Sequence, residues 1–394
     1  MISNRNLTYN IRKYMPDISF IHNTLANRKL ANYRRLLLPQ DLVTKGEREP
    51  DKIPLILDEV KTTRAGQMGR LISFFDRYLK TWQIPLEGDL YEKTRDRMLF
   101  DCMSYGFAPD EFSYYELMKK TPEEKRAYST DLDRKMMQYQ LSDFKDLMYV
   151  FDKTATYEKF AAYYKRDAIS VATQKDYDKF QSFALAHDEM VIKAVSASSG
   201  HGVRIEEADR EDLKGQFERI LSQGKCSIEE RISQSDLTGC INPSSVNTAR
   251  IMTFNTKQGI IIGPCFFRAG RAGSQVDNGG SGGIMVGLDG KTGVLDSNGY
   301  DEYPRSYETH PDSGVRFKGF ALPDWDTCIG TVREMAGQVP RLGFVGWDMA
   351  YTRDDGWVIV EANGGSHIMT QLMYQKGCKE EIEEIMGRMK RYGS

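Results

Sequence analysis

One stretch near the C-terminal end, residues 346–365, has the pattern of a β-hairpin and constrains how the rest of the chain can fold. Two runs in which apolar or aromatic residues alternate with other residues flank Arg353-Asp-Asp-Gly356, and Asp-Gly is a strong turn signal between strands. A turn centred in these four residues places Asp348 directly opposite Glu361. Because side chains alternate between the two faces of a strand, Asn363 lies on the same face as Glu361.

The opposed carboxylates of Asp348 and Glu361 would repel each other, since Cβ atoms in such a pair lie about 4.5–5.5 Å apart. A cation between them removes the repulsion. Asp, Glu and Asn offer hard oxygen ligands, which suit Mg²⁺, or Mn²⁺ as an alternative, rather than zinc, and such Mg²⁺ sites are usually completed by nucleotide phosphates. The hairpin therefore predicts a metal–nucleotide site with Asp348, Glu361 and Asn363 as metal ligands. An ordinary hairpin with an exposed polar face is the alternative interpretation.

The composition is that of a globular chain, with 394 residues, of which 40% are hydrophobic and 28% charged. This length accommodates roughly two or three domains. The formal net charge of −2 gives no electrostatic reason to bind nucleic acid. The six cysteines form no CxxC pair, which favours a reducing compartment, and no apolar run is long enough for a membrane span or a signal peptide. We therefore expect a cytoplasmic protein that does not bind nucleic acid.

Changes of pattern along the chain predict four segments. Residues 1–95 form a basic, helical N-terminal region, and residues 96–185 lead from helices into α/β structure. Residues 186–235 form a small lobe with a glycine loop, and residues 236–394 form a large lobe with a C-terminal helix. The basic N-terminal stretch could lie on an anionic membrane surface or a partner, or it could pack on the rest of the chain with its charges in solvent.

The loop 196–202 joins two predicted strands and contains Ser199, Gly200 and Gly202. Small residues let backbone N–H groups converge on an anion, although the loop lacks the G-K-[ST] ending of a P-loop and a polar turn explains it nearly as well. Lys193 precedes this loop within an apolar strand, and Lys153 lies earlier in the chain. Each lysine could place a positive charge against phosphates, or could be an ordinary solvated lysine.

Further along the chain, Arg250 and Arg268 lie at predicted strand positions. Near a metal–phosphate site, arginines there suit bidentate binding of phosphate or carboxylate. The strand 228–232, which contains Glu229, Glu230 and Ile232, links the two lobes and could contact adenine through backbone groups, or could be only a linker.

The order of these features resembles the ATP-grasp superfamily, and more closely the sugar-transfer-associated ATP-grasp proteins. The likeness covers about residues 95–375 and says little about residues 1–90. It rests on motifs that recur in order: Asn247-Thr-Ala-Arg250, Arg268-Ala-Gly-Arg271, Asp277-Asn278, His310-Pro311, Leu322-Pro-Asp-Trp325, Gly346-Trp-Asp348 and Glu361-Ala-Asn363.

The resemblance implies an α+β fold of the ATP-grasp type, in which two lobes hold ATP, preceded here by a mainly helical region. By position it implies that Lys153 and Lys193 contact the ATP phosphates, and that the loop 196–202, with Ser199, Gly200 and Gly202, closes over them. Glu229, Glu230 and Ile232 would contact adenine, and Asp348, Glu361 and Asn363 would bind Mg²⁺. Arg250 and Arg268 would contact the transferred phosphoryl group or the acyl phosphate. Arg231 departs from the apolar or aromatic residue that is frequent at this position of the linker.

The resemblance also implies a ligase that joins a small-molecule carboxylate to an amine, including sugar-linked substrates, through an acyl phosphate. Lys193, Arg250 and Arg268 would be its catalytic residues. Such a ligase could act in the biosynthesis of surface polysaccharide or of peptide-like metabolites. A small-molecule kinase on the same fold and a regulatory nucleotide-binding module are the alternatives, and the sequence does not identify the substrates or the oligomeric state.

Overall fold

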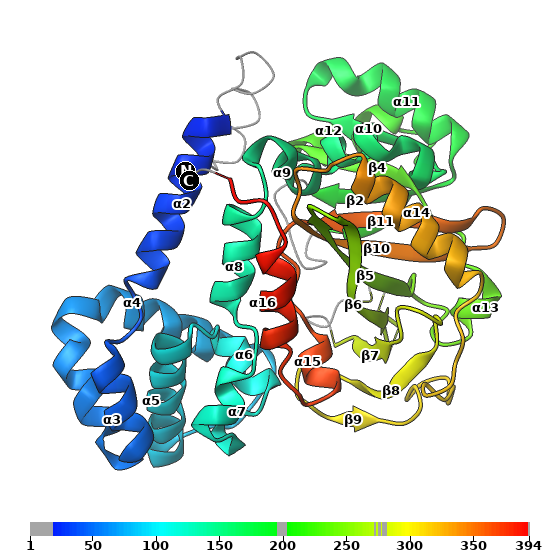
Figure 1. Ribbon diagram of the computed structural model, residues 1–394. Coiled ribbons are helices and arrows are strands. Elements are labelled where there is room, and N and C mark those ends of the chain that lie inside the picture. The colour runs from blue at the N-terminus through cyan, green and yellow to red at the C-terminus, as the bar shows by residue number, and fades with distance from the viewer. Residues whose placement is uncertain (1–18, 195–202, 272, 275–276, 278–281, 393–394) are drawn as a thin grey trace.

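The structure is a computed structural model that describes residues 19–194, 203–271, 273–274, 277 and 282–392. The described residues form a four-stranded and a seven-stranded β-sheet together with a large helical region (Figure 1). Within these residues, no helix combines the length and the hydrophobicity that are required to cross a membrane.

The N-terminal region is helical, as the sequence predicts. It comprises α2 (Ser19–Arg34), α3 (Gln40–Arg48), η1 (Pro50–Lys52), α4 (Ile53–Thr81), α5 (Gly88–Tyr105), α6 (Pro109–Tyr114), η2 (Leu117–Lys119), α7 (Pro122–Arg126) and α8 (Asp131–Gln140). Helices α7 and α8 begin with capping boxes, in which Thr121 and Thr130 accept hydrogen bonds from the backbone N–H groups of Glu124 and Asp133.

The small lobe is built on a four-stranded antiparallel sheet in the order β1-β4-β2-β3. Two helices, α11 and α12, cover one face of it, where Phe180 and Phe217 pack against Ile192 and Ile228. Strand β1 pairs with β4, so the sheet extends across the predicted boundary between residues 185 and 186. Its elements are α9 (Phe144–Phe151), α10 (Lys153–Tyr164), β1 (Ala168–Val171), η3 (Gln174–Asp176), α11 (Tyr177–Ala186), β2 (Glu189–Ala194), β3 (Val203–Glu207), α12 (Leu213–Ser222) and β4 (Cys226–Glu230).

The large lobe contains an antiparallel sheet in the order β11-β10-β5-β6-β7-β8-β9. Helix α14 covers one face, where Val332 and Met335 belong to the same apolar core as Ile251 and Trp347. Its elements are α13 (Asp236–Gly239), β5 (Thr248–Thr256), β6 (Gly259–Ala269), β7 (Ile284–Leu288), β8 (Leu295–Tyr300), β9 (Ser306–Tyr307), α14 (Trp325–Gly337), β10 (Phe344–Thr352), β11 (Gly356–Asn363), α15 (Thr370–Met373) and α16 (Lys379–Gly387).

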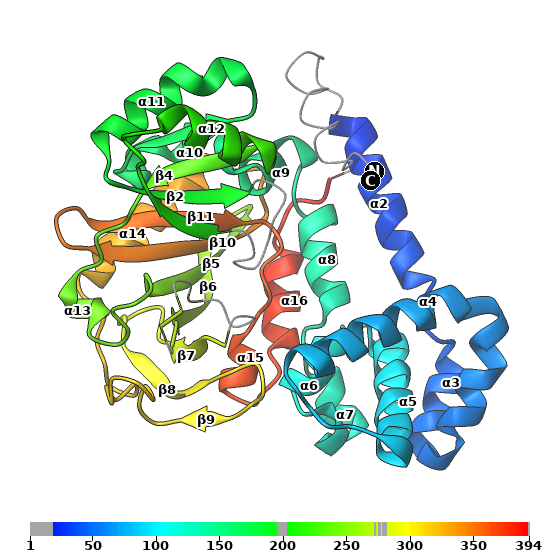
Figure 2. The ribbon, with the colours of Figure 1, turned by 180° about the vertical axis from the view of Figure 1, so that it is seen from behind.

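A second core joins the N-terminal helices to this sheet. Phe75 and Phe100 from the helices belong to the same cluster of buried residues as Phe254 and Phe344 from the strands. Residues of α15 and α16, including Leu372 and Ile382, complete this cluster. Seen from behind in Figure 2, α15 and α16 lie between the helical region and the large sheet. The N-terminal region is therefore packed against the large lobe rather than held apart from it.

The hairpin of β10 and β11 confirms the predicted pairing of Asp348 with Glu361. The turn register differs from the predicted one by one residue, and a β-bulge that the sequence did not indicate offsets the difference. The turn closes with Thr352 opposite Gly356, whereas the predicted turn would place Arg353 there. A β-bulge next to Asp348 shifts the register back, because Val360 has no opposite residue. Without that bulge, Glu361 would not face Asp348.

Candidate active site

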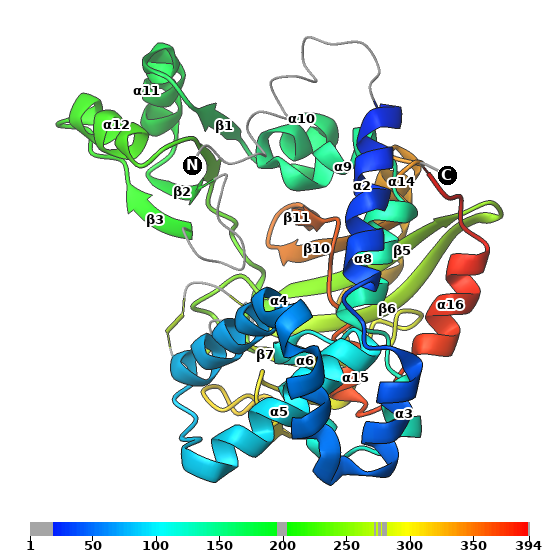
Figure 3. The ribbon, with the colours of Figure 1, turned by 90° about the vertical axis from the view of Figure 1, so that its left-hand side faces the viewer.

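A cavity of about 1660 Å³ lies where the small and large lobes meet. Lys153, Lys193 and Glu229 line it from the small lobe, and Asp348 and Glu361 line it from the large lobe. Figure 3 shows the four-stranded sheet standing apart from β10 and β11, which form one edge of the larger sheet. The cavity also reaches the N-terminal helices, where its lining includes Asp110, Tyr114 and Arg134. It is larger than the range of about 300–1,000 Å³ typical of small-molecule pockets, so it could hold a nucleotide and a second substrate together.

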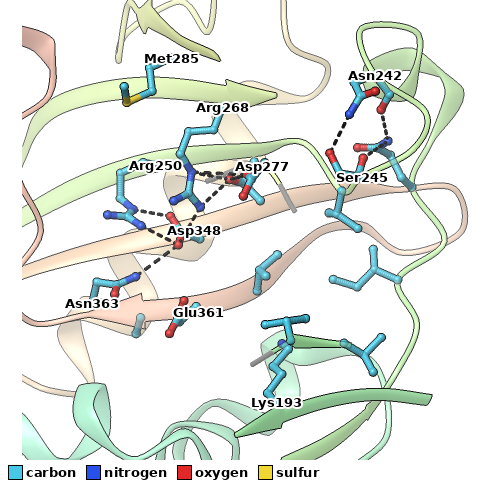
Figure 4. Close-up of a pocket in the computed structure, with 18 of the residues that line it drawn as sticks. Lys193, Asn242, Ser245, Arg250, Arg268, Asp277, Met285, Asp348, Glu361 and Asn363 are labelled. Carbon is cyan, nitrogen blue, oxygen red and sulfur yellow. Dashed lines mark hydrogen bonds and ion pairs between the residues drawn. The ribbon is translucent and has the colours of Figure 1, made fainter. Parts of the chain in front are cut away.

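Asp348 lies at the centre of a buried ion-pair network (Figure 4). The strand register places Glu361, Asp348 and Arg250 in one row across β11, β10 and β5. Both oxygens of Asp348 accept hydrogen bonds from Arg250, with Nη2–Oδ2 at 2.7 Å, and Arg268 Nη2 lies 3.0 Å from Oδ2. Burial raises the pKa of Asp348, but the charges of Arg250 and Arg268 outweigh burial and lower it. Asp348 is therefore ionised at neutral pH.

This network corrects one step of the argument for a metal ion. The sequence suggested that a cation must separate Asp348 from Glu361, whereas the guanidinium groups of Arg250 and Arg268 already compensate Asp348. Glu361 is half-buried and makes no hydrogen bond or ion pair with any other described residue. Asn363 donates from Nδ2 to Asp348 Oδ2 at 3.3 Å, which leaves its amide oxygen for another partner. These hard oxygen donors fit Mg²⁺, provided that Asp348 shares its oxygens with the arginines.

Arg268 also pairs with a second carboxylate, that of Asp277. Thr248 Oγ1 donates to Asp277, while Arg268 Nε lies 3.0 Å from Thr248 Oγ1 and 3.4 Å from Asp277 Oδ2. Burial raises the pKa of Asp277, although the charge of Arg268 partly offsets this effect. The sequence analysis includes Thr248 in the motif Asn247-Thr-Ala-Arg250 but gives it no role. The register explains its position, because Thr248 lies directly opposite Arg268 on the neighbouring strand.

Lys193 points into the cavity from β2 and is held by a buried carboxylate. Its Nζ lies 2.6 Å from Glu229 Oε2, and Arg166 Nη2 lies 2.6 Å from the same oxygen. Burial raises the pKa of Glu229, but the charges of Lys193 and Arg166 outweigh it and lower the pKa to about 2. Burial also lowers the pKa of Lys193, and Glu229 only partly offsets this effect. Sequence reasoning missed Arg166, which lies outside every motif and becomes significant only through the fold.

The other predicted site residues lie around the same cavity. Lys153 is the first residue of α10 and is half-buried in the cavity wall. Glu230 is the last residue of β4, and its Oε2 accepts a hydrogen bond of 3.1 Å from the backbone N–H of Asp167. Ile232 lines the cavity just beyond the end of β4. The predicted loop residues Ser199, Gly200 and Gly202 lie outside the described residues.

Comparison with known families identifies the family to which these features correspond. A family model described as sugar-transfer associated ATP-grasp matches residues 139–387. A comparison with curated proteins found no match. The match to the family covers all the described site residues named above except those of the N-terminal helices.

Solved structures of three enzymes resemble parts of this chain, and one of them, PsnB, is described as an ATP-grasp ligase. N5-carboxyaminoimidazole synthetase from Staphylococcus aureus with ADP is 11% identical, with 58% of this chain and 48% of that chain covered and a TM-score of 0.38. D-alanyl-alanine synthetase A from Vibrio cholerae is 10% identical, with 63% and 67% covered and a TM-score of 0.41. The ATP-grasp ligase PsnB with a minimal precursor, Mg and ADP is 11% identical, with 63% and 61% covered and a TM-score of 0.37. The chain thus spans about half the length of the first of these proteins.

Proposed function

This chain belongs to the sugar-transfer-associated ATP-grasp family and has the ATP-grasp fold, and from this we propose that it is an ATP- and Mg²⁺-dependent ligase that joins a carboxylate to an amine. The observation that carries the proposal is the cavity between the lobes. It presents Lys193 from one lobe and the network of Arg250, Asp348 and Arg268 from the other.

ATP would lie between the lobes, with its phosphates towards the large sheet. Lys153 and Lys193 would contact the phosphates, and the loop with Ser199, Gly200 and Gly202 would cover them. The segment with Glu229, Glu230 and Ile232 would contact adenine, mostly through backbone groups. Glu229 is paired with β1 and β2 in the sheet, so the backbone contact falls mainly to Ile232. The position of Ile232 in the cavity wall, beyond the last ladder pair of β4, supports this arrangement, because backbone groups there are not committed to the sheet.

Asp348, Glu361 and Asn363 would hold Mg²⁺, with Mn²⁺ as an alternative ion. The bound ion would neutralise charge on the ATP phosphates and orient them. The carboxylate of Glu361 and the amide oxygen of Asn363 support this assignment, because neither accepts a hydrogen bond from another residue in the described part of the chain. Since Asp348 is shared with Arg250 and Arg268, the same carboxylate would fix the two guanidinium groups beside the phosphates.

In the proposed reaction, a carboxylate oxygen of the acid attacks the γ-phosphorus of ATP, and ADP leaves. Arg250, Arg268 and Lys193 would bind the anions that this step brings together, so their contribution is positioning and electrostatic stabilisation. The amine nitrogen then attacks the carbonyl carbon of the acyl phosphate, loses a proton and releases phosphate. A cavity lined by both lobes would limit the access of water to this intermediate.

Trapping with hydroxylamine tests the proposal directly, because hydroxylamine converts an acyl phosphate into a stable hydroxamate. The protein would be incubated with ATP, Mg²⁺ and pooled amino acids and sugar acids, and hydroxamate and ADP would be measured together. We expect hydroxamate that depends on ATP and is lost in Lys193→Ala and Glu361→Ala. The matched control is Lys175→Ala, which removes an exposed lysine of the small lobe.

Other outcomes would assign the site differently. ADP with a stable phosphorylated product and no hydroxamate would indicate a kinase on the same fold. Binding of ATP without any product across the pool would favour a regulatory nucleotide-binding module. Activity that survives Glu361→Ala would contradict the metal assignment.

A further inference from the structure

Arg166 lines the cavity and connects the two lobes. It follows Lys165, the residue directly after α10, and its side chain is only 5% exposed. From this position, Nη2 and Nε lie 2.6 and 3.2 Å from Glu229 Oε2 in the small lobe. Nη1 donates at 2.7 Å to the backbone oxygen of Ile359 in the large lobe.

Several contacts hold the guanidinium group of Arg166 in place. Nη1 also donates to the backbone oxygen of Tyr164 at 3.2 Å, and the guanidinium carbon lies 4.4 Å from the centre of the Tyr164 ring. Ile359, which accepts the inter-lobe hydrogen bond, immediately precedes the bulge residue Val360. Arg166 is thus tied to the part of β11 that sets the position of Glu361.

Lys193 shares the same oxygen of Glu229 but is less tightly enclosed, with 13% of its side chain exposed to the cavity. In the structure, Lys193 Nζ is paired with Glu229 Oε2 at 2.6 Å. When Lys193 moves to a phosphate, the carboxylate of Glu229, which is 4% exposed, loses one of its two cations. A buried carboxylate without any cation is strongly unfavourable, so a remaining partner is needed at that moment.

We propose that Arg166 is a positioning residue that keeps Glu229 charge-compensated while Lys193 transfers from Glu229 to the phosphates of the bound nucleotide. This inference rests on the proposed function, since it requires a nucleotide in the cavity. It assigns to Glu229 a second role beside the proposed contact with adenine. Its side chain holds Lys193 until the phosphates arrive.

The test compares binding of ATP with Mg²⁺ by titration calorimetry and binding of adenosine by saturation-transfer NMR. Adenosine has no phosphate and does not recruit Lys193, so it reports on the adenine end of the cavity alone. We expect Arg166→Gln to weaken ATP binding by at least about tenfold while leaving adenosine binding within about twofold. Arg166→Lys, which retains the charge, should bind ATP within a few-fold of wild type.

The double variant Arg166→Gln/Glu229→Gln separates charge compensation from structural damage. Removing the carboxylate removes the need for a remaining cation, so the double variant should recover most of the ATP affinity that Arg166→Gln loses. Arg210→Gln is the matched control, because it breaks an arginine–carboxylate pair with Asp188 on the surface of the small lobe.

Equal losses for ATP and adenosine, or no recovery in the double variant, would overturn the inference. If Arg166→Gln does not fold, the double variant and Arg166→Lys test the proposed role instead. A tenfold loss of ATP affinity in both of these variants would contradict it. A wild-type protein that binds neither ligand would instead contradict the proposed function. Wild-type binding with an unaffected Arg166→Gln would contradict the role of Arg166 alone.

Discussion

The carboxylate of Asp348 is 1% exposed, and it accepts hydrogen bonds from Arg250 and also pairs with Arg268. A buried carboxylate in this position organises the two guanidinium groups whether or not a metal ion is bound. At the scale of single residues, the site therefore depends on charge balance in a region from which water is largely excluded.

Asp348→Asn would keep the shape of the side chain but remove its charge. Arg250 would lose its carboxylate partner, and Arg268 would keep its ion pair with Asp277 but lose the one with Asp348. Because breaking a buried ion pair leaves an uncompensated charge, we expect the free energy of unfolding to fall by about 3 kcal/mol in urea denaturation. Asp355→Asn, in the exposed turn of the same hairpin, should change it by less than about 0.5 kcal/mol. Equal stability of the two variants would show that the network contributes little.

Glu229 makes stability depend on pH in a defined direction. Its pKa is lowered from an ordinary value of 4.5 to about 2 in the folded protein, because Lys193 and Arg166 outweigh the effect of burial. A lowered pKa stabilises the folded state above the unfolded value, and this stabilisation is lost as pH falls through the window between about 5 and 2. We expect Glu229→Gln to lose less stability between pH 5 and pH 3 than wild type in urea denaturation. Glu218→Gln, an exposed substitution in α12, should follow the wild-type curve.

At the scale of elements, the β10–β11 hairpin shows what local sequence can and cannot predict. The alternating pattern and the Asp-Gly turn correctly predict the hairpin. The predicted pairing of Asp348 with Glu361 is confirmed, but only because the bulge offsets a turn register that was wrong by one residue. The bulge at Val360 has no comparable sequence signal, because it depends on how β11 packs on its neighbours. The cross-strand position of Arg250 next to Asp348 likewise follows from sheet order, which local periodicity does not specify.

Long-range contacts explain why other parts of the candidate site could not be predicted. Motifs identify Lys193, Arg250, Arg268 and Glu361, whose residue types suit phosphate or metal binding. Arg166 has no such motif, and it gains a role only because β1, β4 and β11 bring Glu229 and Ile359 to it. The side-chain role of Glu229 was missed for the same reason.

Gly343 marks a close contact between elements. It lies just before β10, and a Cβ atom there would meet the backbone oxygen of Leu141, beyond α8. Because backbone cannot move aside as a side chain can, we expect Gly343→Ala to lower the melting temperature by several degrees, equivalent to about 2 kcal/mol. Gly330→Ala in α14 is the matched control, since that position is exposed with no atom nearby. It should stabilise the protein by about 0.5–1 kcal/mol.

At the scale of the whole molecule, the boundary of the family match does not coincide with a boundary in the packing of the chain. The match begins at residue 139, but the core shared by the N-terminal helices and the large sheet crosses that point. Tyr115 and Phe100 from the N-terminal side belong to one buried cluster with Met252, Phe254 and Phe344 from the sheet. The same helices supply Asp110 and Tyr114 to one end of the cavity.

A fragment of residues 139–394 should therefore not behave as an independent domain. Removing the preceding residues would expose Met252, Phe254 and Leu372, together with other apolar residues of the shared core, to water. Because exposed apolar area of this kind is unfavourable by about 25 cal/mol per Å², we expect the fragment to bind the dye ANS strongly and to lack a cooperative thermal transition. The full chain, measured in parallel, should melt cooperatively without binding ANS. A fragment that melts as cooperatively as the full chain would show that the N-terminal helices fold as a separate unit. These helices would then dock against a large lobe that is already folded when they complete the cavity.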